Sequence, residues 1–375
     1  MPRILLLSAY DAQSHRVWRE QLVAQFPQYD WTELVLPPRY FSWRIRGNSL
    51  TWAFDDAVKS KCFDLVIATS MTDISALIGM APNLSGVPVI QYFHENQFAY
   101  PLSDKAAPQM VEPQMVQLYG AISASVVCFN SEFNRQSFLS GVRALLKKLP
   151  DAIPPGIEDQ LRRKSRVLPV PIASAGTQTM SESESEALTE LISDKALSIV
   201  WNHRWEYDKG PERLLACIEA LPETLDLNFH ILGQRFRSQP KVFEDIQALL
   251  RSRAWLGHWG YVAATDEYLS ILAQTDLVLS TAVHDFQGLS VLEACRLGCT
   301  PVVPDRLAYV EIFDAEYRYG SESDLSLEAS AAANMIEKIA KSPERRIPNL
   351  NQFSWQQLQA PYGELIESLL NTESS

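Results

Sequence analysis

Two acidic residues and one glycine lie close together in the segment 276–304, in the order Asp285, Gly288 and Glu293. The apolar run before them predicts a buried strand, and the pattern after them predicts a helix that starts near Gly288. The start of a helix offers unpaired N–H groups and a positive dipole end, which suit a diphosphate or a sugar hydroxyl. Glu293 can accept hydrogen bonds from a ribose diol, and Asp285 can hold sugar hydroxyls. The spacing therefore predicts a sugar-nucleotide site.

Each acid alone has a simpler interpretation, because Glu293 could be a solvated helix residue and Asp285 an ordinary loop residue. The two acids flank one strand–loop–glycine–helix unit, and this combination favours a ligand site. Gly288 lets a ligand approach the main chain closely.

Two cations, Arg204 and Lys209, lie in residues 201–210, which follow a predicted strand and precede a predicted helix. Both can neutralise the negative charge of a departing diphosphate. The alternative is that Arg204 belongs to a salt bridge and Lys209 is solvated.

A polar cluster follows a predicted strand of the first half of the chain. It consists of His94, Glu95, Asn96 and Gln97. Ligands of open parallel sheets bind outside the carboxyl ends of the strands. We therefore expect both halves of the chain to present such loops to a cleft between two domains.

The alternation of apolar runs with helical patterns predicts an α/β fold with two parallel sheets. Strands are expected at residues 4–8, 32–36, 65–68, 88–93, 125–129, 198–202, 228–232, 277–280 and 301–303. With 375 residues, the length suits about two domains. The expected divisions are a first domain at 1–172, an acidic Ser-rich linker at 173–195, a second domain at 196–352 and a returning C-terminal helix at 353–375.

The net charge of −12 argues against broad attraction to nucleic acid. Local basic clusters can still contact RNA, or can simply be solvated. They are Arg39, Arg44 and Arg46; Lys147 and Lys148; and Arg162, Arg163, Lys164 and Arg166. The five cysteines are scattered, and Cys295 and Cys299 are expected as small core residues of one helix. No signal pattern or membrane-length apolar run occurs, so we expect a soluble cytoplasmic protein and no membrane partner.

The second half resembles the retaining glycosyltransferases of family four, which have the GT-B fold of two Rossmann-like domains facing a cleft. The matching residues are Asp285, Phe286, Gln287, Gly288 and Glu293, preceded by Arg204 and Lys209. The first acid of that family is usually glutamate, so Asp285 is one methylene shorter.

Motifs along nearly the whole chain resemble those of the tRNA-queuosine α-mannosyltransferases. They are Phe41-Ser-Trp-Arg-Ile-Arg46, Tyr92-Phe-His-Glu-Asn-Gln97, Cys128-Phe-Asn-Ser131, Trp201-Asn-His-Arg-Trp-Glu206, His258-Trp-Gly-Tyr261 and Glu311-Ile-Phe313. The resemblance implies transfer of mannose from GDP-mannose to the cyclopentene diol of queuosine in the anticodon of an aspartate tRNA. One loop departs from the family, because Ala12-Gln13-Ser14-His15 stands where the family has Gly-Gly-Ser-His.

The resemblance also implies that the protein is a monomer and needs no metal or other cofactor. It further implies roles for individual residues. The implied catalytic residues are His94, Arg204, Lys209 and Asp285. The implied donor-binding residues are Arg204, Lys209, Tyr261, Asp285, Phe286, Gln287, Gly288, Leu289 and Glu293. The implied acceptor-binding residues are Ser14, His15, Arg44, Arg46, His94, Glu95, Asn96 and Gln97. A donor phosphate oxygen would take the acceptor proton during attack from the same face.

Two further interpretations stay open at this point. One is a GT-B transferase for a small molecule, lipid or polysaccharide, which the net acidity favours. The other is a noncatalytic binding module, which Arg204, Lys209 and Glu293 disfavour. For an RNA acceptor, we predict a dock on a loop from Arg39 to Arg46, with Tyr40, Phe41 and Trp43 for stacking on unpaired bases. The alternative dock is residues 147–166.

Overall fold

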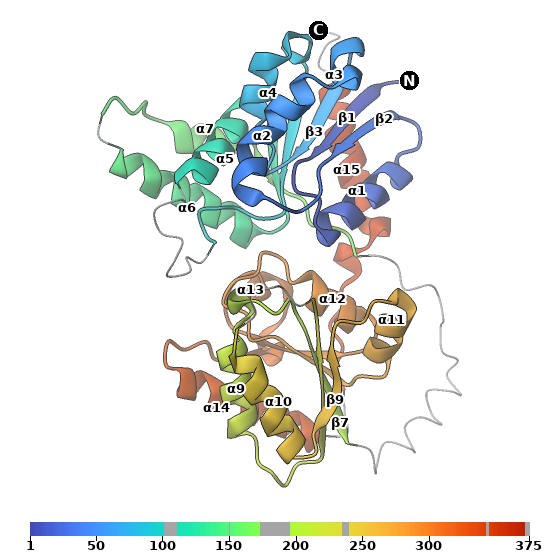
Figure 1. The fold of residues 1–375 in the computed structure, drawn as a ribbon, viewed down its shortest axis with the longest axis vertical. Helices are drawn as coiled ribbons and strands as arrows, with labels where there is room; N and C mark the ends of the chain where they lie inside the picture. Colours follow the sequence, from blue (N-terminus) through green and yellow to red (C-terminus); the bar gives the residue numbers. More distant parts are fainter. Residues whose placement is uncertain (101–110, 150, 173–195, 235–239, 343–344, 372–375) are drawn as a thin grey trace. The chain divides into compact units, whose positions relative to one another are not determined.

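The computed structural model describes residues 1–100, 111–149, 151–172, 196–234, 240–342 and 345–371 (Figure 1). They form two compact units, one of Met1–Pro171 with Trp355–Ser375 and one of Ile172–Ser354. Each unit has its own six-stranded sheet, and every strand pair within the sheets is parallel. The predicted α/β fold with two parallel sheets is confirmed. The expected linker, 173–195, lies outside the described residues.

The first sheet has the strand order β2-β1-β3-β4-β5-β6. Its strands are β1 Arg3–Ser8, β2 Asp30–Val35, β3 Leu65–Thr69, β4 Val89–Phe93, β5 Val126–Phe129 and β6 Ser165–Val167. The five strands predicted for this half of the chain are confirmed to within two residues. The short strand β6 was not predicted, because only its first residue is buried and no apolar run marks it.

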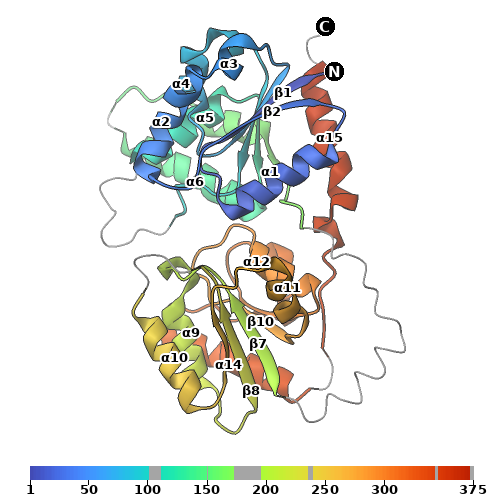
Figure 2. The same cartoon turned by 45° about the vertical axis from the view of Figure 1, so that its right-hand side comes forward.

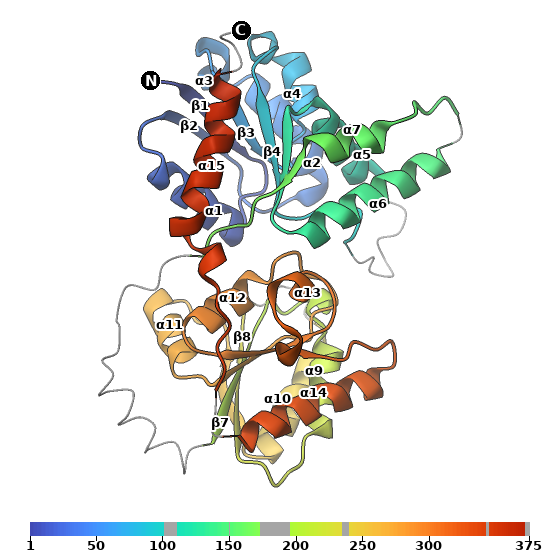
Figure 3. The ribbon, with the colours of Figure 1, turned by 180° about the vertical axis from the view of Figure 1, so that it is seen from behind.

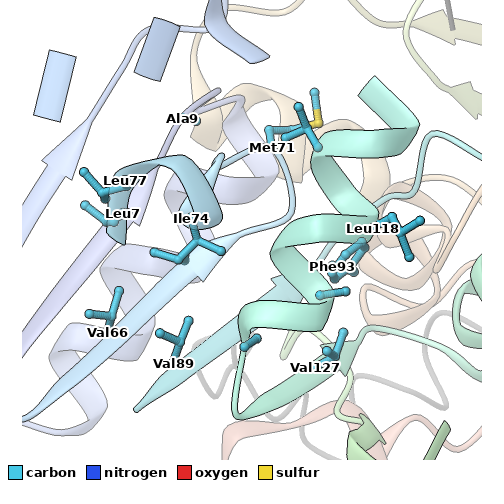
Figure 4. Packing of buried hydrophobic residues seen from close by; sticks show 14 of the residues in the cluster. Leu7, Ala9, Val66, Met71, Ile74, Leu77, Val89, Phe93, Leu118 and Val127 are labelled. Carbon is cyan, nitrogen blue, oxygen red and sulfur yellow. The ribbon is translucent and has the colours of Figure 1, made fainter. Parts of the chain in front are cut away.

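Helices cover both faces of the first sheet. They are α1 Gln13–Gln25, α2 Phe41–Ala53, α3 Asp56–Ser60, α4 Ile74–Met80, α5 Val111–Ser123, α6 Glu132–Lys148, α7 Ile157–Lys164 and α15 Trp355–Leu370. Figure 4 shows Val66, Val89 and Val127 of neighbouring strands packed beneath Ile74 of α4 and Leu118 of α5. The opposite face carries α1 and the C-terminal helix α15 (Figure 3).

The predicted loop from Arg39 to Arg46 is wrong, because α2 begins at Phe41. Residues 45, 48, 49 and 52 of α2 are buried, and this is the spacing of one helix face. Asn48 and Ser49 belong to that face, so polar residues hid the helical pattern. Arg44 and Arg46 therefore project from a helix.

The C-terminal helix α15 is fixed to the first unit by hydrogen bonds at Tyr362. Trp18 Nε1 of α1 donates to Tyr362 Oη at 2.9 Å, and Tyr362 Oη donates to the Pro169 carbonyl at 3.0 Å. Tyr362 Oη also lies 3.2 Å from Tyr92 Oη on β4. These contacts join α15 to the strand that precedes the polar cluster 94–97.

The second sheet has the strand order β12-β11-β10-β7-β8-β9. Its strands are β7 Leu197–Asn202, β8 Leu227–Leu232, β9 Leu256–Gly260, β10 Leu277–Leu279, β11 Thr300–Pro304 and β12 Arg318–Tyr319. The four strands predicted for this half are confirmed. The two edge strands β9 and β12 were not predicted, because β9 buries only Gly260 and β12 has two residues.

The helices of the second unit also form two layers (Figure 2). They are α9 Pro211–Ala220, α10 Val242–Ser252 and α14 Leu325–Ala340 on one face, and α11 Thr265–Ala273, α12 Leu289–Arg296 and α13 Tyr309–Ile312 on the other. The prediction that Cys295 and Cys299 share a helix is wrong, because α12 ends at Arg296 and Gly298 turns the chain at φ 106°. Both thiols are buried, and Cys299 Sγ donates to the carbonyls of Leu272 and Thr275.

Candidate functional site

The predicted donor residues of the second unit gather where strands β7 and β10 end. These strands are parallel neighbours, so the loops after Asn202 and Leu279 lie at the same edge of the sheet. Lys209, at the end of the first loop, donates from Nζ to the His284 carbonyl at 2.9 Å and to Asp285 Oδ2 at 3.3 Å. The structure therefore brings together Lys209 and Asp285, which are 76 positions apart in the chain.

Asp285 is held as a carboxylate by its neighbours. Its Oδ1 accepts a hydrogen bond from the Gly288 N–H at 2.9 Å, and Tyr309 Oη lies 3.4 Å from its Oδ2. Burial raises the pKa of Asp285, but the charge of Lys209 and the Gly288 hydrogen bond outweigh it, so the pKa lies well below its usual range. Asp285 is therefore ionised at neutral pH.

Gly288 is required by the backbone at the start of α12. Its φ is 68°, and a Cβ there would lie 2.6 Å from the Tyr309 ring. The helix starts at Leu289, as predicted, and its first turn presents N–H groups without partners in the helix. The Tyr309 ring occupies the space next to Gly288. The sequence had predicted that a ligand would approach the main chain there.

Glu293, on the second turn of α12, is held by a tyrosine from another helix. Tyr268 Oη of α11 donates to Glu293 Oε2 at 3.0 Å. Asn202, the last residue of β7, donates from Nδ2 to Tyr268 Oη at 3.0 Å and to the Ser290 carbonyl at 2.9 Å. Burial raises the pKa of Glu293, and the hydrogen bond from Tyr268 opposes that shift. The carboxylate is thus positioned near the first turn of the helix.

Arg204 is paired with acids of its own loop. Its Nη1 lies 2.7 Å from Glu206 Oε2, and its Nη2 lies 3.8 Å from Asp208 Oδ2. Asp208 Oδ2 is also 3.4 Å from Lys209 Nζ. The Arg204 side chain is 48% exposed, whereas that of Lys209 is 10% exposed. An incoming phosphate would reach Arg204 readily and would compete with Glu206 for it.

The other predicted donor residues differ in exposure. Tyr261, just beyond β9, is exposed, while Phe286 and Gln287 are buried within the loop and Leu289 is half-buried as the first residue of α12. The sequence interpretation did not single out His203, Asp208, Tyr268 or Ser290, which complete this cluster. Position after a strand could have drawn attention to His203 and Asp208. No local signal marks Tyr268, because a distant helix supplies it.

In the first unit, His94 and His15 form a stacked pair. His94 follows β4, and His15 lies in the first turn of α1; their ring centroids are 4.2 Å apart at an interplanar angle of 28°. Trp18 meets His94 edge-on at 4.8 Å. His94 is 6% exposed, and both of its ring nitrogens are buried without a hydrogen-bond partner among the described residues. Burial, followed by the nearby His15, holds the pKa of His94 well below its usual value, so its ring is neutral.

His15 has the opposite character. Its Nδ1 is 2.8 Å from the Tyr10 carbonyl, and its Nε2 is 3.7 Å from Glu95 Oε2. Burial lowers the pKa of His15, but Glu95, the Tyr10 carbonyl and Asp11 together outweigh burial, and the net pKa is raised. The stack therefore joins a ring that favours a proton to one that excludes it. Ser14, beside His15, is exposed.

Asn96 and Gln97 are turned toward the protein interior. Asn96 is fully buried, and its Nδ2 donates to Asn134 Oδ1 at 2.8 Å and to Ser137 Oγ at 2.9 Å on α6. Gln97 is also buried, with Nε2 4.0 Å from Met71 Sδ. Of the predicted cluster 94–97, His94 and Glu95 contact His15. Asn96 instead holds the loop against α6.

The arginines predicted for the acceptor lie on α2. Arg46 Nη1 is 2.7 Å from Asp73 Oδ2, and Arg46 Nε is 3.5 Å from Glu112 Oε1. The indole of Trp43 lies over Gly47, where a Cβ would be 2.3 Å from the ring. Trp43 is nevertheless 56% exposed. A glycine inside this helix thus lets an aromatic ring lie flat while one of its faces meets solvent.

Within the described ranges, no three His, Cys, Asp or Glu side chains are arranged to hold a metal ion. None of the described helices is both long enough and apolar enough to span a bilayer.

The fold is that of the GT-B glycosyltransferases. Sucrose-phosphate synthase from Thermosynechococcus elongatus superimposes with a TM-score of 0.72 at 14% identity, covering 98% of this chain and 99% of that one. The N-terminal domain of Candida albicans trehalose-6-phosphate phosphatase superimposes with a TM-score of 0.70 at 12% identity, covering 98% and 97%.

Sequence comparison gives the particular family. The N-terminal profile of the tRNA-queuosine α-mannosyltransferases matches residues 3–172. A protein of Drosophila melanogaster named tRNA-queuosine alpha-mannosyltransferase is 30% identical over 377 residues, covering 100% of this chain and 99% of that protein. The chain therefore belongs to the tRNA-queuosine α-mannosyltransferase family and is a glycosyltransferase, which confirms the family predicted from the motifs.

Proposed function

We propose that this protein transfers mannose from GDP-mannose to the cyclopentene diol of queuosine in the anticodon of an aspartate tRNA, with retention of configuration. The family match over the whole chain supports the acceptor and the sugar. The donor side rests on one observation, the contact of Lys209 with Asp285 beside the first turn of α12. The positive charge of Lys209, the carboxylate of Asp285 and the start of α12 therefore lie together at one edge of a parallel sheet.

On the donor side, Lys209, Arg204 and the first-turn amides of α12 stabilise the diphosphate as GDP departs. This stabilisation is largest in the transition state, when negative charge moves onto the phosphate oxygen. Glu293 accepts hydrogen bonds from the ribose diol, and Asp285 holds sugar hydroxyls. We propose that these groups act without a metal or another cofactor.

On the acceptor side, a hydroxyl of the queuosine diol attacks mannose C1 from the face that GDP leaves. The bond between C1 and the phosphate oxygen breaks, a bond from C1 to the acceptor oxygen forms, and a donor phosphate oxygen takes the hydroxyl proton. His94 supplies a neutral ring with two unsatisfied nitrogens, so it can hold the acceptor or the phosphate by a hydrogen bond. Glu95 and His15 keep that ring in place.

We propose that α2 docks the anticodon loop. Arg44 and Arg46 contact phosphates, and the exposed face of Trp43 stacks on an unpaired base. Arg39 and Tyr40 extend the same surface, with the guanidinium 5.5 Å from the Tyr40 ring centroid. The reaction takes place in the cytoplasm, and the enzyme works as a monomer.

The test is a transfer assay with GDP-mannose and two preparations of the same tRNA, one with queuosine and one with guanosine at the wobble position. The proposal predicts that mannose is attached only to the first. Transfer to a small saccharide or lipid acceptor, with neither tRNA modified, would identify a GT-B transferase of another acceptor class.

A further inference from the structure

His203 lies directly after β7, between the loop that carries Lys209 and the start of α12. The residue is 3% exposed. Ser290 Oγ, in the first turn of α12, is 3.3 Å from His203 Nδ1. The ring also meets Trp201 edge-on, with the ring centroids 5.0 Å apart. Two neighbouring elements thus fix the orientation of this imidazole.

The second ring nitrogen of His203 has no protein partner. Nε2 is buried and forms no hydrogen bond with any described residue. Because buried polar atoms in native proteins are nearly always hydrogen-bonded, an unpaired ring nitrogen of this kind is expected where a ligand completes the bonding.

The ring of His203 is neutral. Burial, followed by the charge of Lys209, lowers its pKa to about 3, although Asp285 opposes the shift. A neutral imidazole has one nitrogen that donates and one that accepts. The Ser290 hydroxyl can donate to Nδ1, and Nε2 then carries the proton. Phosphate oxygens accept hydrogen bonds and do not donate them, so this tautomer suits a diphosphate beside Lys209 and Arg204.

We propose that His203 Nε2–H donates a hydrogen bond to the diphosphate of the donor sugar nucleotide, and that Ser290 holds the ring in the required tautomer. This inference rests on the proposed binding of the donor by the second unit. It adds a neutral donor to the two cations, so that an uncharged group also contributes to the recognition of the diphosphate.

A matched pair of amide variants tests the proposal. Glutamine at position 203 places its amide nitrogen near the former Nε2, whereas asparagine places it near the former Nδ1. His203→Gln should bind GDP within about threefold of wild type, and His203→Asn should bind it about tenfold or more weakly, as expected for a lost hydrogen bond to a charged group. The exposed His258→Asn serves as the control. Thermal melting of all variants reports on folding, and because both amides lack the ring, a general packing defect would weaken both alike.

The ligand series separates the possible contacts. An equal loss of affinity for GDP and GDP-mannose in His203→Asn supports the bond to the diphosphate. If His203→Asn lost affinity for GDP-mannose alone, His203 would contact the sugar, and the proposed bond to the diphosphate would be wrong. The proposed bond would also be wrong if His203→Asn and wild type bound GDP equally well. Wild-type protein that binds neither ligand would overturn the proposed donor, which is a different failure from the loss of the His203 contact alone.

Discussion

The proposed donor site of the second unit and the histidine pair of the first unit differ in whether their polar groups have internal partners. In the second unit, Lys209 is paired with Asp285, and Arg204 with Glu206. In the first unit, His94 has two buried nitrogens without hydrogen-bond partners among the described residues. The donor cations are therefore held in position by internal counter-ions, whereas His94 is held by packing against His15 and Trp18. At the proposed donor site, loss of the buried Lys209 should therefore lower both stability and turnover, whereas loss of the half-exposed Arg204 should lower turnover alone.

The largest expected effect comes from Lys209→Ala. Turnover should fall by on the order of a hundredfold, because a charge that stabilises the departing diphosphate is lost. The free energy of unfolding should also fall by about 3 kcal/mol, because Asp285 and Asp208 lose a buried partner. Steady-state kinetics and urea denaturation measure the two effects.

Arg204→Ala is the matched comparison. It should lower turnover by a similar factor and leave the unfolding free energy nearly unchanged, because the Arg204 side chain is half-exposed. If both variants lost stability equally, or if either kept turnover within about twofold of wild type, the contrast between the two cations would be wrong.

The two donor acids should differ in what they recognise. Glu293→Gln should weaken GDP binding by about 1.5–3 kcal/mol, because hydrogen bonds to a charged group are lost. Asp285→Asn should reduce the preference for GDP-mannose over other GDP-sugars more than it reduces affinity for free GDP. Tyr268→Phe should resemble Glu293→Gln in a weaker form, since it removes the hydrogen bond that holds the carboxylate. Calorimetry with GDP and GDP-sugars measures these affinities. Equal losses of GDP affinity in the two acid variants would contradict the proposed roles.

The RNA surface on α2 is tested by reversing charge. The double variant Arg44→Glu and Arg46→Glu should bind queuosine tRNA about tenfold or more weakly, with the salt slope reduced by roughly 1.4 for two lost phosphate contacts. Arg44→Glu should account for most of the loss, because Arg46 is already paired with Asp73 and Glu112. Affinity for GDP-mannose should not change.

The control for the RNA surface is Lys147→Glu with Lys148→Glu on α6. Filter binding at several salt concentrations distinguishes the two surfaces. Loss of tRNA affinity in the Lys147 and Lys148 variant, with none in the α2 variant, would move the dock to residues 147–166.

The smallest expected effect is the pH dependence of stability from the stacked histidines. Folding raises the pKa of His15, so its pairing with Glu95 stabilises the protein fully below about pH 6.5 and is lost as pH rises through the folded pKa. Folding lowers the pKa of His94, so stability falls as pH drops below about 6.5, where the unfolded chain binds a proton that the folded chain excludes.

Melting temperatures against pH separate the two histidines. The difference between wild type and His15→Asn should shrink as pH rises, because asparagine keeps the hydrogen bond to the Tyr10 carbonyl and removes the titration. The difference between wild type and His94→Asn should change most below pH 6.5 and in the opposite direction. Parallel pH profiles for the two variants would show that the rings do not titrate as described.

The grouping of the proposed donor residues was largely predictable because these residues follow strands. Lys209 and Asp285 each come after a buried apolar run, and parallel strands bring such loops to one edge. Tyr268 was not predictable, since it comes from the middle of α11 and reaches Glu293 only through tertiary packing. The start of α2 was missed because buried Asn48 and Ser49 interrupt its apolar face. The stacking of His15 on His94 likewise depends on how α1 packs, which local spacing does not reveal.

Retaining transfer to queuosine is tested most directly by analysis of the product. The protein is incubated with GDP-mannose and queuosine-containing aspartate tRNA, the tRNA is digested to nucleosides, and the products are separated by mass before and after treatment with an α-specific mannosidase. We predict a hexosylated queuosine that the α-specific enzyme converts back to queuosine. Unmodified queuosine, or a hexosylated product that only a β-specific mannosidase cleaves, would contradict the proposed reaction.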